Sequence, residues 1–198
     1  MEGEERAWGI LATLSPQDVA RRTGACYNAS SHTFTLDMYG KPIHVSTEDR
    51  RMWGDSSVAR FLLIEFHYYS RLSVLWYMVQ ARDMPLSGSL INPSHMRDGL
   101  LFRGGSHALP LDKVAGRYGD DAEAFVRRGL ELGGERLDFG DASLRLFPFP
   151  RVPVVLVLWK NDQEFPARAD LLFDSTCSAH LPTDILWSTA MISVLIMV

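Results

Sequence analysis

Cysteine is scarce in this 198-residue sequence, which contains only Cys26 and Cys177. The two lie far apart in the chain and belong to no motif of paired cysteines, so a disulfide scaffold is excluded. A zinc or iron–sulfur site with four cysteine ligands from this chain alone is excluded as well. A reducing compartment fits this cysteine usage, and we expect a cytoplasmic protein.

The sequence also lacks a long hydrophobic run and an excess of basic residues. Its most apolar stretch, residues 185–198, is shorter than the roughly 20 residues that cross a bilayer and is interrupted by serine and threonine. The first six residues are acidic and polar, where a signal peptide would be basic and then apolar. A formal net charge of −4 argues against nucleic-acid binding through phosphate contacts. We therefore expect neither a membrane nor a nucleic acid as partner.

The composition is that of a folded globular domain. Hydrophobic residues make up 46% of the chain and charged residues 22%. A chain of this length can bury roughly 70% of the surface that it exposes when unfolded, so it needs no disulfide or metal to fold. The sequence contains no internal repeat and no long linker. We predict a single domain over residues 1–198.

The N-terminal third predicts a short helix and then a hairpin. Ser15 and Pro16 are typical of the start of a helix, which we expect to run to about Arg22. Apolar and polar residues then alternate between Cys26 and Ser46, around a turn at residues 39–41. This pattern predicts an N-terminal β-hairpin.

The middle of the chain predicts one long helix, about residues 56–82, which begins after Asp55. Its apolar residues recur at intervals of three and four, so one face meets a core. A segment rich in Gly, Ser, Pro and Asn follows at residues 85–110. Two further helices are expected at about 111–118 and 121–132.

The last third predicts strands and a terminal helix. Residues 142–149 alternate in polarity, and residues 152–159 form a nearly continuous β-branched run that is typical of a central strand. Another strand is expected at residues 169–173, and a buried helix begins near Thr183. The predicted fold class is therefore α+β, with an N-terminal β-hairpin, one long central helix and a C-terminal, mostly antiparallel sheet closed by the terminal helix.

The segment from His95 to His107 is the first candidate site, because it combines glycine, arginine and histidine. Glycines let a ligand approach the backbone, arginines favour an anion, and histidines offer acid–base or ligand chemistry. The candidate binding residues are Arg97, Arg103, Gly104, Gly105 and His107. The segment has neither a P-loop nor a dinucleotide fingerprint. The alternative is a surface loop with glycine turns and solvated arginines.

Two further residues are candidates for contact with a cofactor. His67 lies within the long predicted helix, where its imidazole could ligate a haem or corrinoid metal. The alternative is a histidine bonded to a backbone carbonyl. Trp159 is one of several aromatic residues that could line a pocket, although aromatic residues usually belong to the core.

Three carboxylates form the second candidate site. Asp162 and Glu164 follow the predicted central strand, and Asp174 follows the next one. Together they could bind a hard cation such as Mg²⁺ or Ca²⁺ through oxygen ligands. The alternative is that Asp162 caps a tight turn and Glu164 meets an arginine such as Arg168.

Catalytic residues cannot be assigned from motifs. Cys177 has His180 three residues later, but proximity in sequence is not the geometry of a catalytic pair. The sequence has no Gly-x-Ser-x-Gly nucleophile elbow and no His-Glu-x-x-His helix. The absence of these motifs favours a non-catalytic protein, while an enzyme is left open as an alternative.

Several segments together resemble an uncharacterised prokaryotic family, domain of unknown function 3786. They are Leu86-Ser87-Gly88, Arg103-Gly104-Gly105, Phe147 to Pro153, Trp159 to Pro166, and Leu172-Phe173-Asp174-Ser175. The resemblance covers most of the chain, and its most specific part is the tryptophan-to-proline motif followed by Leu-Phe-Asp.

The resemblance implies the kind of organism and the metabolic context, but it does not imply a particular reaction. The family occurs mainly in anaerobes, and some relatives are fused to a four-cysteine iron–sulfur domain like that of corrinoid proteins. This context implies an accessory role near corrinoid or one-carbon chemistry. The present sequence departs from those fusions because it lacks the four cysteines, and it also lacks the Asp-x-His-x-x-Gly motif of many corrinoid proteins.

These observations leave three functional hypotheses. The first is a non-catalytic binding protein that holds a tetrapyrrole or corrinoid-type cofactor, or an anionic small molecule, between the long helix and the C-terminal sheet. The second is an enzyme that uses the acidic cluster around a divalent cation. The third is an interaction subunit or homodimer that uses the apolar terminal helix. The identity of any cofactor is left open.

Overall fold

The computed structural model describes residues 2–96, 99–102 and 108–198. Its α-helices are α1 (Glu2–Leu11), α2 (Pro16–Thr23), α3 (Ser57–Arg60), α4 (His67–Gln80), α5 (Leu111–Tyr118), α6 (Ala122–Glu131), α7 (Cys177–His180) and α8 (Thr183–Leu195). The other helical turns of the described residues, which are not α-helical, are η1 (Phe61–Glu65), η2 (Pro93–His95) and η3 (Gly99–Phe102). The strands are β1 (Cys26–Asn28), β2 (Thr33–Met38), β3 (Lys41–Ser46), β4 (Arg51–Trp53), β5 (Leu90–Ile91), β6 (Glu135–Leu137), β7 (Ala142–Phe149), β8 (Val152–Trp159) and β9 (Arg168–Asp174). The fold class is α+β, as the sequence predicts.

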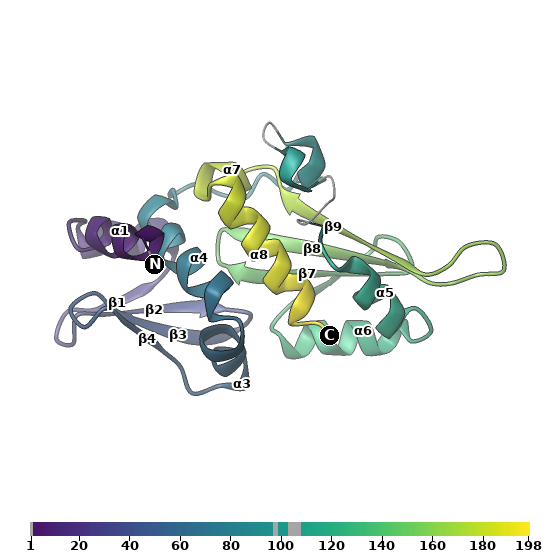
Figure 1. Cartoon of the computed structure of the whole chain (residues 1–198), viewed down its shortest axis with the longest axis horizontal. Coiled ribbons are helices and arrows are strands. Elements are labelled where there is room, and N and C mark those ends of the chain that lie inside the picture. The colour runs from purple at the N-terminus through teal and green to yellow at the C-terminus, as the bar shows by residue number, and fades with distance from the viewer. Residues whose placement is uncertain (1, 97–98, 103–107) are drawn as a thin grey trace.

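The strands form two antiparallel sheets; in Figure 1 the first lies at the left and the second runs from the centre to the right. The first sheet has the order β1-β2-β3-β4. Its centre is the β2–β3 pair, in which Leu36 lies opposite Ile43 and the chain turns at Tyr39 and Gly40. The residues expected to form one hairpin therefore belong to a four-stranded sheet, because β1 and β4 add a strand at each edge.

The second sheet has the order β5-β9-β8-β7-β6, and its middle strand, β8, is buried along most of its length. Alternate residues such as Val154 and Leu156 belong to the main core, as the period of a strand requires. The expectation of a closed sheet is wrong: within the part of the chain that the structure describes, β5 and β6 are free edges. Helix α8 instead lies across one face of the sheet (Figure 1).

The long helix expected at residues 56–82 is interrupted. Helix α3 passes into the π-helical turn η1, where the backbone N–H of Phe66 donates to the carbonyl oxygen of Phe61 at 2.9 Å, and α4 then begins at His67. The hydroxyl of Ser70 donates to the carbonyl oxygens of Leu62 and Phe66, which accommodates the changed hydrogen bonding. A π-turn shifts the faces of the helix without interrupting the apolar run, so a period of three and four does not reveal it.

Helix α8 packs beside α4 and has no charged residue after Asp184. Its apolar residues are largely buried within this chain, including Leu186, Ile192 and Val194. The hydroxyl of Thr189 donates to the carbonyl of Ile185 at 2.8 Å. Among the described residues, no helix is long and apolar enough to cross a membrane.

Candidate functional site

A cavity of about 610 Å³ lies between the described residues 92–95, 102, 108, 109 and 111 on one side and the middle of β9 on the other. It is lined by Asn92, Pro93, Ser94, His95, Phe102, Ala108, Leu109, Leu111, Asp170 and Leu171. This volume is within the range of sites that hold small molecules and cofactors, and so is a mostly apolar lining with a few polar groups. The sequence predicts a pocket between the long helix and the C-terminal sheet; this cavity lies against β9 of that sheet, and no residue of α4 is in its lining.

The polar side of the cavity is built by the turn η2. The Oδ1 atom of Asn92 accepts hydrogen bonds from the backbone N–H of Ser94 at 2.9 Å and from the Ser94 hydroxyl at 2.7 Å. Pro93 follows this cap and supplies the fixed φ that suits the first position of a helical turn. His95 ends the turn and is exposed, so its imidazole is accessible to a ligand.

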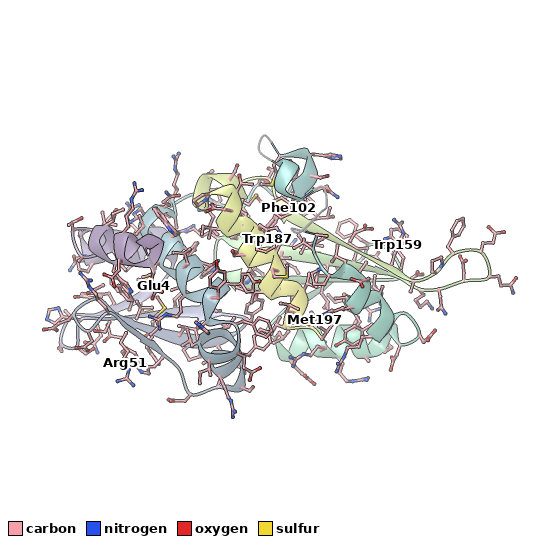
Figure 2. The ribbon with its side chains drawn as sticks, viewed as in Figure 1. Glu4, Arg51, Phe102, Trp159, Trp187 and Met197 are labelled. Atoms are coloured by element: carbon pink, nitrogen blue, oxygen red, sulfur yellow. The ribbon has the colours of Figure 1, made fainter. Side chains whose placement is uncertain are left out.

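The apolar side of the cavity is anchored on the second sheet. The ring of Phe102 meets the ring of Phe173 edge to face, with 6.5 Å between the ring centroids. This contact fixes η3 against β9, and Figure 2 shows Phe102 at this position. Phe173 and Leu171 are both buried. Since both sides rest on the sheet or on a capped turn, much of the cavity wall is preformed.

Asp170 brings a charge to the cavity, but this charge has partners. The indole N–H of Trp159 donates to its Oδ2 atom at 2.9 Å, and an Arg168 nitrogen lies 3.6 Å from the same oxygen. The Arg168 guanidinium also stacks over the Trp159 ring, 4.7 Å from its centroid. Trp159, a predicted contact residue, therefore touches a lining residue without lining the cavity itself.

The other predicted binding residues fall into two groups, those outside the described residues and His67. Arg97, Arg103, Gly104, Gly105 and His107 lie outside the residues that the structure describes. His67 is described, and it lies on the surface at the start of α4, where its Nδ1 atom is 3.0 Å from the carbonyl oxygen of Ile64. The structure does not bring His67 to this cavity.

The three predicted metal ligands do not converge. Asp162 caps a turn, because its Oδ1 atom accepts the backbone N–H groups of Glu164 at 2.8 Å and Phe165 at 2.7 Å, and these bonds lower its pKa. Asp162 and Glu164 precede β9, whereas Asp174 ends it, so roughly 20 Å of strand separates them. In residues 2–96, 99–102 and 108–198, no group of three His, Cys, Asp or Glu side chains could hold a metal ion.

Asp174 instead joins two segments of the chain. Its Oδ1 atom accepts hydrogen bonds from the backbone N–H and the hydroxyl of both Ser87 and Thr176, and its Oδ2 atom accepts the N–H of Gly88 at 2.8 Å. Asp174 as a whole is only 3% exposed. Burial alone would raise the pKa of Asp174, but the hydrogen bonds from Thr176 and Ser87 lower it to about 2. Asp174 is therefore a charged anchor for the loop after α4.

Cys177 is not placed as a nucleophile. It is buried, its Sγ atom lies 3.9 Å from the Sδ atom of Met96, and burial raises the pKa of the thiol to about 12. His180 is fully buried and accepts the backbone N–H of Arg82 at its Nδ1 atom, 3.2 Å away. Burial lowers the pKa of His180, which keeps the ring neutral. A protonated thiol and a buried imidazole are typical of packing rather than of thiolate chemistry.

Sequence reasoning missed several lining residues. Asn92 had a usable signal, because Asn-Pro-Ser is a typical start of a capped turn. Asp170 and Leu171 had none, because they lie about 60 residues or more beyond the loop and alternate like any strand. Their role follows only from the pairing of β5 with β9, in which Leu90 lies opposite Asp174.

The comparisons with known proteins give one finding. The family model described as "Domain of unknown function (DUF3786)" matches residues 15–195. No curated protein and no solved structure matches the chain significantly.

Proposed function

The chain belongs to the family of the domain of unknown function 3786, and we propose that it is a binding protein whose ligand occupies the cavity beside β9. The observation that carries this proposal is the cavity itself, which measures about 610 Å³ and has one apolar and one polar side. Both sides rest on fixed structure, through the Asn92 cap and the contact between Phe102 and Phe173. A preformed site lowers the entropic cost of ordering the protein around a ligand.

The lining favours a ligand with an apolar or aromatic body and one polar end. Phe102 and the leucines would contact the body, while Asn92 and His95 would meet the polar end. An anionic end would lie near Asp170, whose carboxylate already pairs with Arg168 and accepts a hydrogen bond from Trp159.

A tetrapyrrole is one cofactor of this chemistry. It would need an axial ligand, and His95 is the described histidine in the cavity lining. An accessory role near corrinoid chemistry in an anaerobe is part of this proposal and follows from the family resemblance, while the cytoplasmic setting follows from the cysteine usage.

Binding is favoured over catalysis by the chemistry of the described lining. Its titratable side chains are His95 and Asp170, and Asp170 is engaged by Trp159 and Arg168. General acid–base catalysis needs groups that are free to exchange a proton with the substrate. A single imidazole offers little for such catalysis.

The proposal is tested by finding the ligand and then blocking the cavity. Protein purified without oxygen is examined by ultraviolet–visible spectroscopy and native mass spectrometry, and an absorbing or massive adduct is expected. Ala108 is exposed at the cavity lining, so Ala108→Phe fills the space with little risk to the fold. Ala29 is exposed in a turn far from the cavity, so Ala29→Phe is the matched control.

The adduct should be lost from Ala108→Phe and kept by Ala29→Phe. For protein that is isolated at its bare mass, the probe is 8-anilinonaphthalene-1-sulfonate, an aromatic anion of the expected chemistry. Its dissociation constant should rise by about tenfold or more in Ala108→Phe, which corresponds to about 1.4 kcal/mol. Equal binding by both variants contradicts the proposed site.

A further inference from the structure

His180, on the short helix α7, is a buried side chain that lacks one of its two hydrogen bonds. It is fully buried, and its Nδ1 atom accepts the backbone N–H of Arg82 at 3.2 Å. A neutral imidazole has one acceptor and one donor nitrogen, so the Nε2 atom carries the proton. This N–H has no acceptor among the residues that the structure describes. Buried polar groups are nearly always hydrogen-bonded, so the exception requires an explanation.

Protonation of His180 is incompatible with its contact to Arg82, which we call the latch. A charged imidazole is a donor at both nitrogens. Its Nδ1–H would face the Arg82 N–H, donor against donor, and its Nε2–H would still lack an acceptor. Because a buried charge without partners is costly, the ring can gain a proton only after the Arg82 backbone has moved away and water has reached the ring.

The charged groups near His180 make protonation of the closed latch less favourable still. Burial lowers the pKa of His180, and the positive charges of Arg151 and Arg82 lower it further, whereas the Asp174 carboxylate raises it. The elements packed against α7 are α4, α8 and β8, whose ionisable side chains are His67, Tyr68, Tyr69, Arg71, Tyr77 and Asp184. The imidazole in this set, His67, is exposed at the end of α4 that lies away from Arg82.

The segment that follows α4, residues 82–89, connects the latch with the proposed binding cavity. It forms no helix or strand, and after β5 the chain reaches Asn92, whose side chain builds the polar side of the cavity. His180 holds the start of the segment, while Arg151 and Asp174 hold later parts of it. Opening of the latch therefore frees the segment at its start.

We propose that protonation of His180 opens the latch, frees residues 82–89 and thereby loosens the wall of the binding cavity. The effect on the cavity rests on the proposed binding function, whereas the opening itself does not. In the open form the ring is in water and has its ordinary pKa of 6.5, above the pKa of the closed form. The closed form is therefore fully favoured above about pH 6.5 and loses up to a factor of about ten for each pH unit below it. The pKa of Asp174 is about 2, so that carboxylate keeps its hydrogen bonds over this range.

Hydrogen exchange measures the latch in the full chain without a ligand. Exchange rates are divided by the intrinsic rate at each pH, which gives a protection factor for each amide. From pH 7.5 to pH 5.0 the protection of residues 82–89 should fall by about tenfold or more, within the limit of about thirtyfold that linkage to one imidazole sets. The amides of β7 and β8 should keep their protection. Unchanged protection of residues 82–89 in the wild-type chain overturns the proposal, whatever the variants show.

His180→Asn is the variant that removes the titrating group and keeps the acceptor. The Oδ1 atom of asparagine can accept the Arg82 N–H, and an amide does not titrate in this range. The protection of residues 82–89 in this variant should be the same at both pH values. His67→Asn is the matched control, because His67 is exposed on α4, and it should respond to pH as the wild type does. A His180→Asn chain that loses protection at pH 5.0 as the wild type does overturns the proposal.

The effect on the cavity is measured with 8-anilinonaphthalene-1-sulfonate as the probe. The dissociation constants of the wild type and of His180→Asn should agree at pH 7.5. At pH 5.0 the wild type should bind the probe more weakly by about twofold or more, because less of it is in the closed form. His95 lines the cavity in both chains, so its own protonation does not affect the comparison.

The two measurements separate the latch from the proposed function. Probe binding at pH 7.5, together with equal affinity of the two chains at pH 5.0, overturns the effect on the cavity. A chain that does not bind the probe at pH 7.5 contradicts the proposed function instead, and hydrogen exchange of residues 82–89 then decides whether His180 opens the latch.

Discussion

At the scale of single residues, Asp162 and Asp174 show how burial decides what a carboxylate does. Both have a lowered pKa and both accept backbone N–H groups. Asp162 does so at the surface, where its two bonds reach a single oxygen. Asp174 does so in the interior, where both oxygens are used and the partners come from the loop after α4 and from Thr176. Only the second arrangement joins two distant segments of the chain through one carboxylate.

We therefore expect Asp174→Asn to destabilise the protein by about 2 kcal/mol at pH 7. The amide can reproduce the acceptor at Oδ1, but its NH₂ group would then face the N–H donor of Gly88. The folded pKa of Asp174, about 2, lies below its ordinary value of 3.8. The charge thus adds stability above about pH 4, and this contribution is lost as the pH falls toward 2.

The measurement is urea unfolding of wild type and variant at several pH values. The gap in unfolding free energy should be largest at neutral pH and should shrink between pH 4 and pH 2. Asp162→Asn is the control and should unfold close to wild type, because its single acceptor oxygen is retained. A gap for Asp174→Asn that is independent of pH would show that the charge is not the cause.

At the scale of elements, the turn between β7 and β8 joins parts of the chain that are far apart in sequence. The Arg151 guanidinium donates to the carbonyl oxygens of Arg22 at 2.7 Å, Met84 at 3.0 Å and Arg21 at 3.1 Å, and to the Asp83 carboxylate at 2.7 Å. It thereby satisfies carbonyls at the end of α2 and holds the segment that follows α4. A lysine side chain donates from a single nitrogen, so it cannot make the same set of hydrogen bonds as the planar arginine guanidinium.

Arg151→Lys should destabilise the protein by about 1–2 kcal/mol, because several charge-assisted hydrogen bonds are lost. The amides of residues 82–90 should also exchange with solvent faster, since that segment loses its attachment. Hydrogen exchange followed by mass spectrometry measures both effects. Arg168→Lys is the control, because the Arg168 side chain is 63% exposed. Unchanged exchange at residues 82–90 would contradict this role for Arg151.

Elements with strong local signals could be predicted from the sequence. Helix α2 begins after the Ser15 cap and ends at Gly24, whose φ of 75° is the left-handed conformation that glycine adopts readily. The long strands β7 and β8 carry their pattern over eight residues each. The π-turn η1 and the three-residue strand β6 have no comparable signal, because a few residues cannot fix a period.

The candidate site also combines residues that the local sequence predicts with residues that it cannot predict. The sequence points to the segment around His95, because loops rich in glycine, proline and asparagine are common at binding sites. It cannot supply Asp170 or Leu171, which reach the cavity only through sheet pairing. The sequence also suggests that Asp162 and Asp174 lie close together, because it does not show that the length of β9 keeps them apart.

At the scale of the whole molecule, the two sheets meet at a tight junction. The backbone N–H of Tyr39 in the first sheet donates to the carbonyl oxygen of Phe147 in the second at 2.8 Å, and the Tyr39 hydroxyl lies 2.8 Å from the Ser193 hydroxyl of α8. Gly40 and Gly133 approach so closely that a Cβ atom on Gly133 would lie 2.7 Å from the Cα of Gly40. One hydrophobic cluster runs through both sheets. We therefore expect residues 1–198 to unfold as one cooperative unit.

Gly133→Ala tests this expectation at the junction. Gly133 has a φ of +67° and is pressed against the backbone of Gly40, whereas Gly88 has a φ of +74° and open space around it. Gly88→Ala should therefore cost about 1 kcal/mol through backbone strain alone, and Gly133→Ala should cost about 2–4 kcal/mol because the clash is added. If the molecule is one unit, this loss must lower the global protection of amides in β2–β3 and in β7–β8 by the same amount. Hydrogen exchange resolves the two sheets separately, and loss of protection in only one of them would show two independently folding parts.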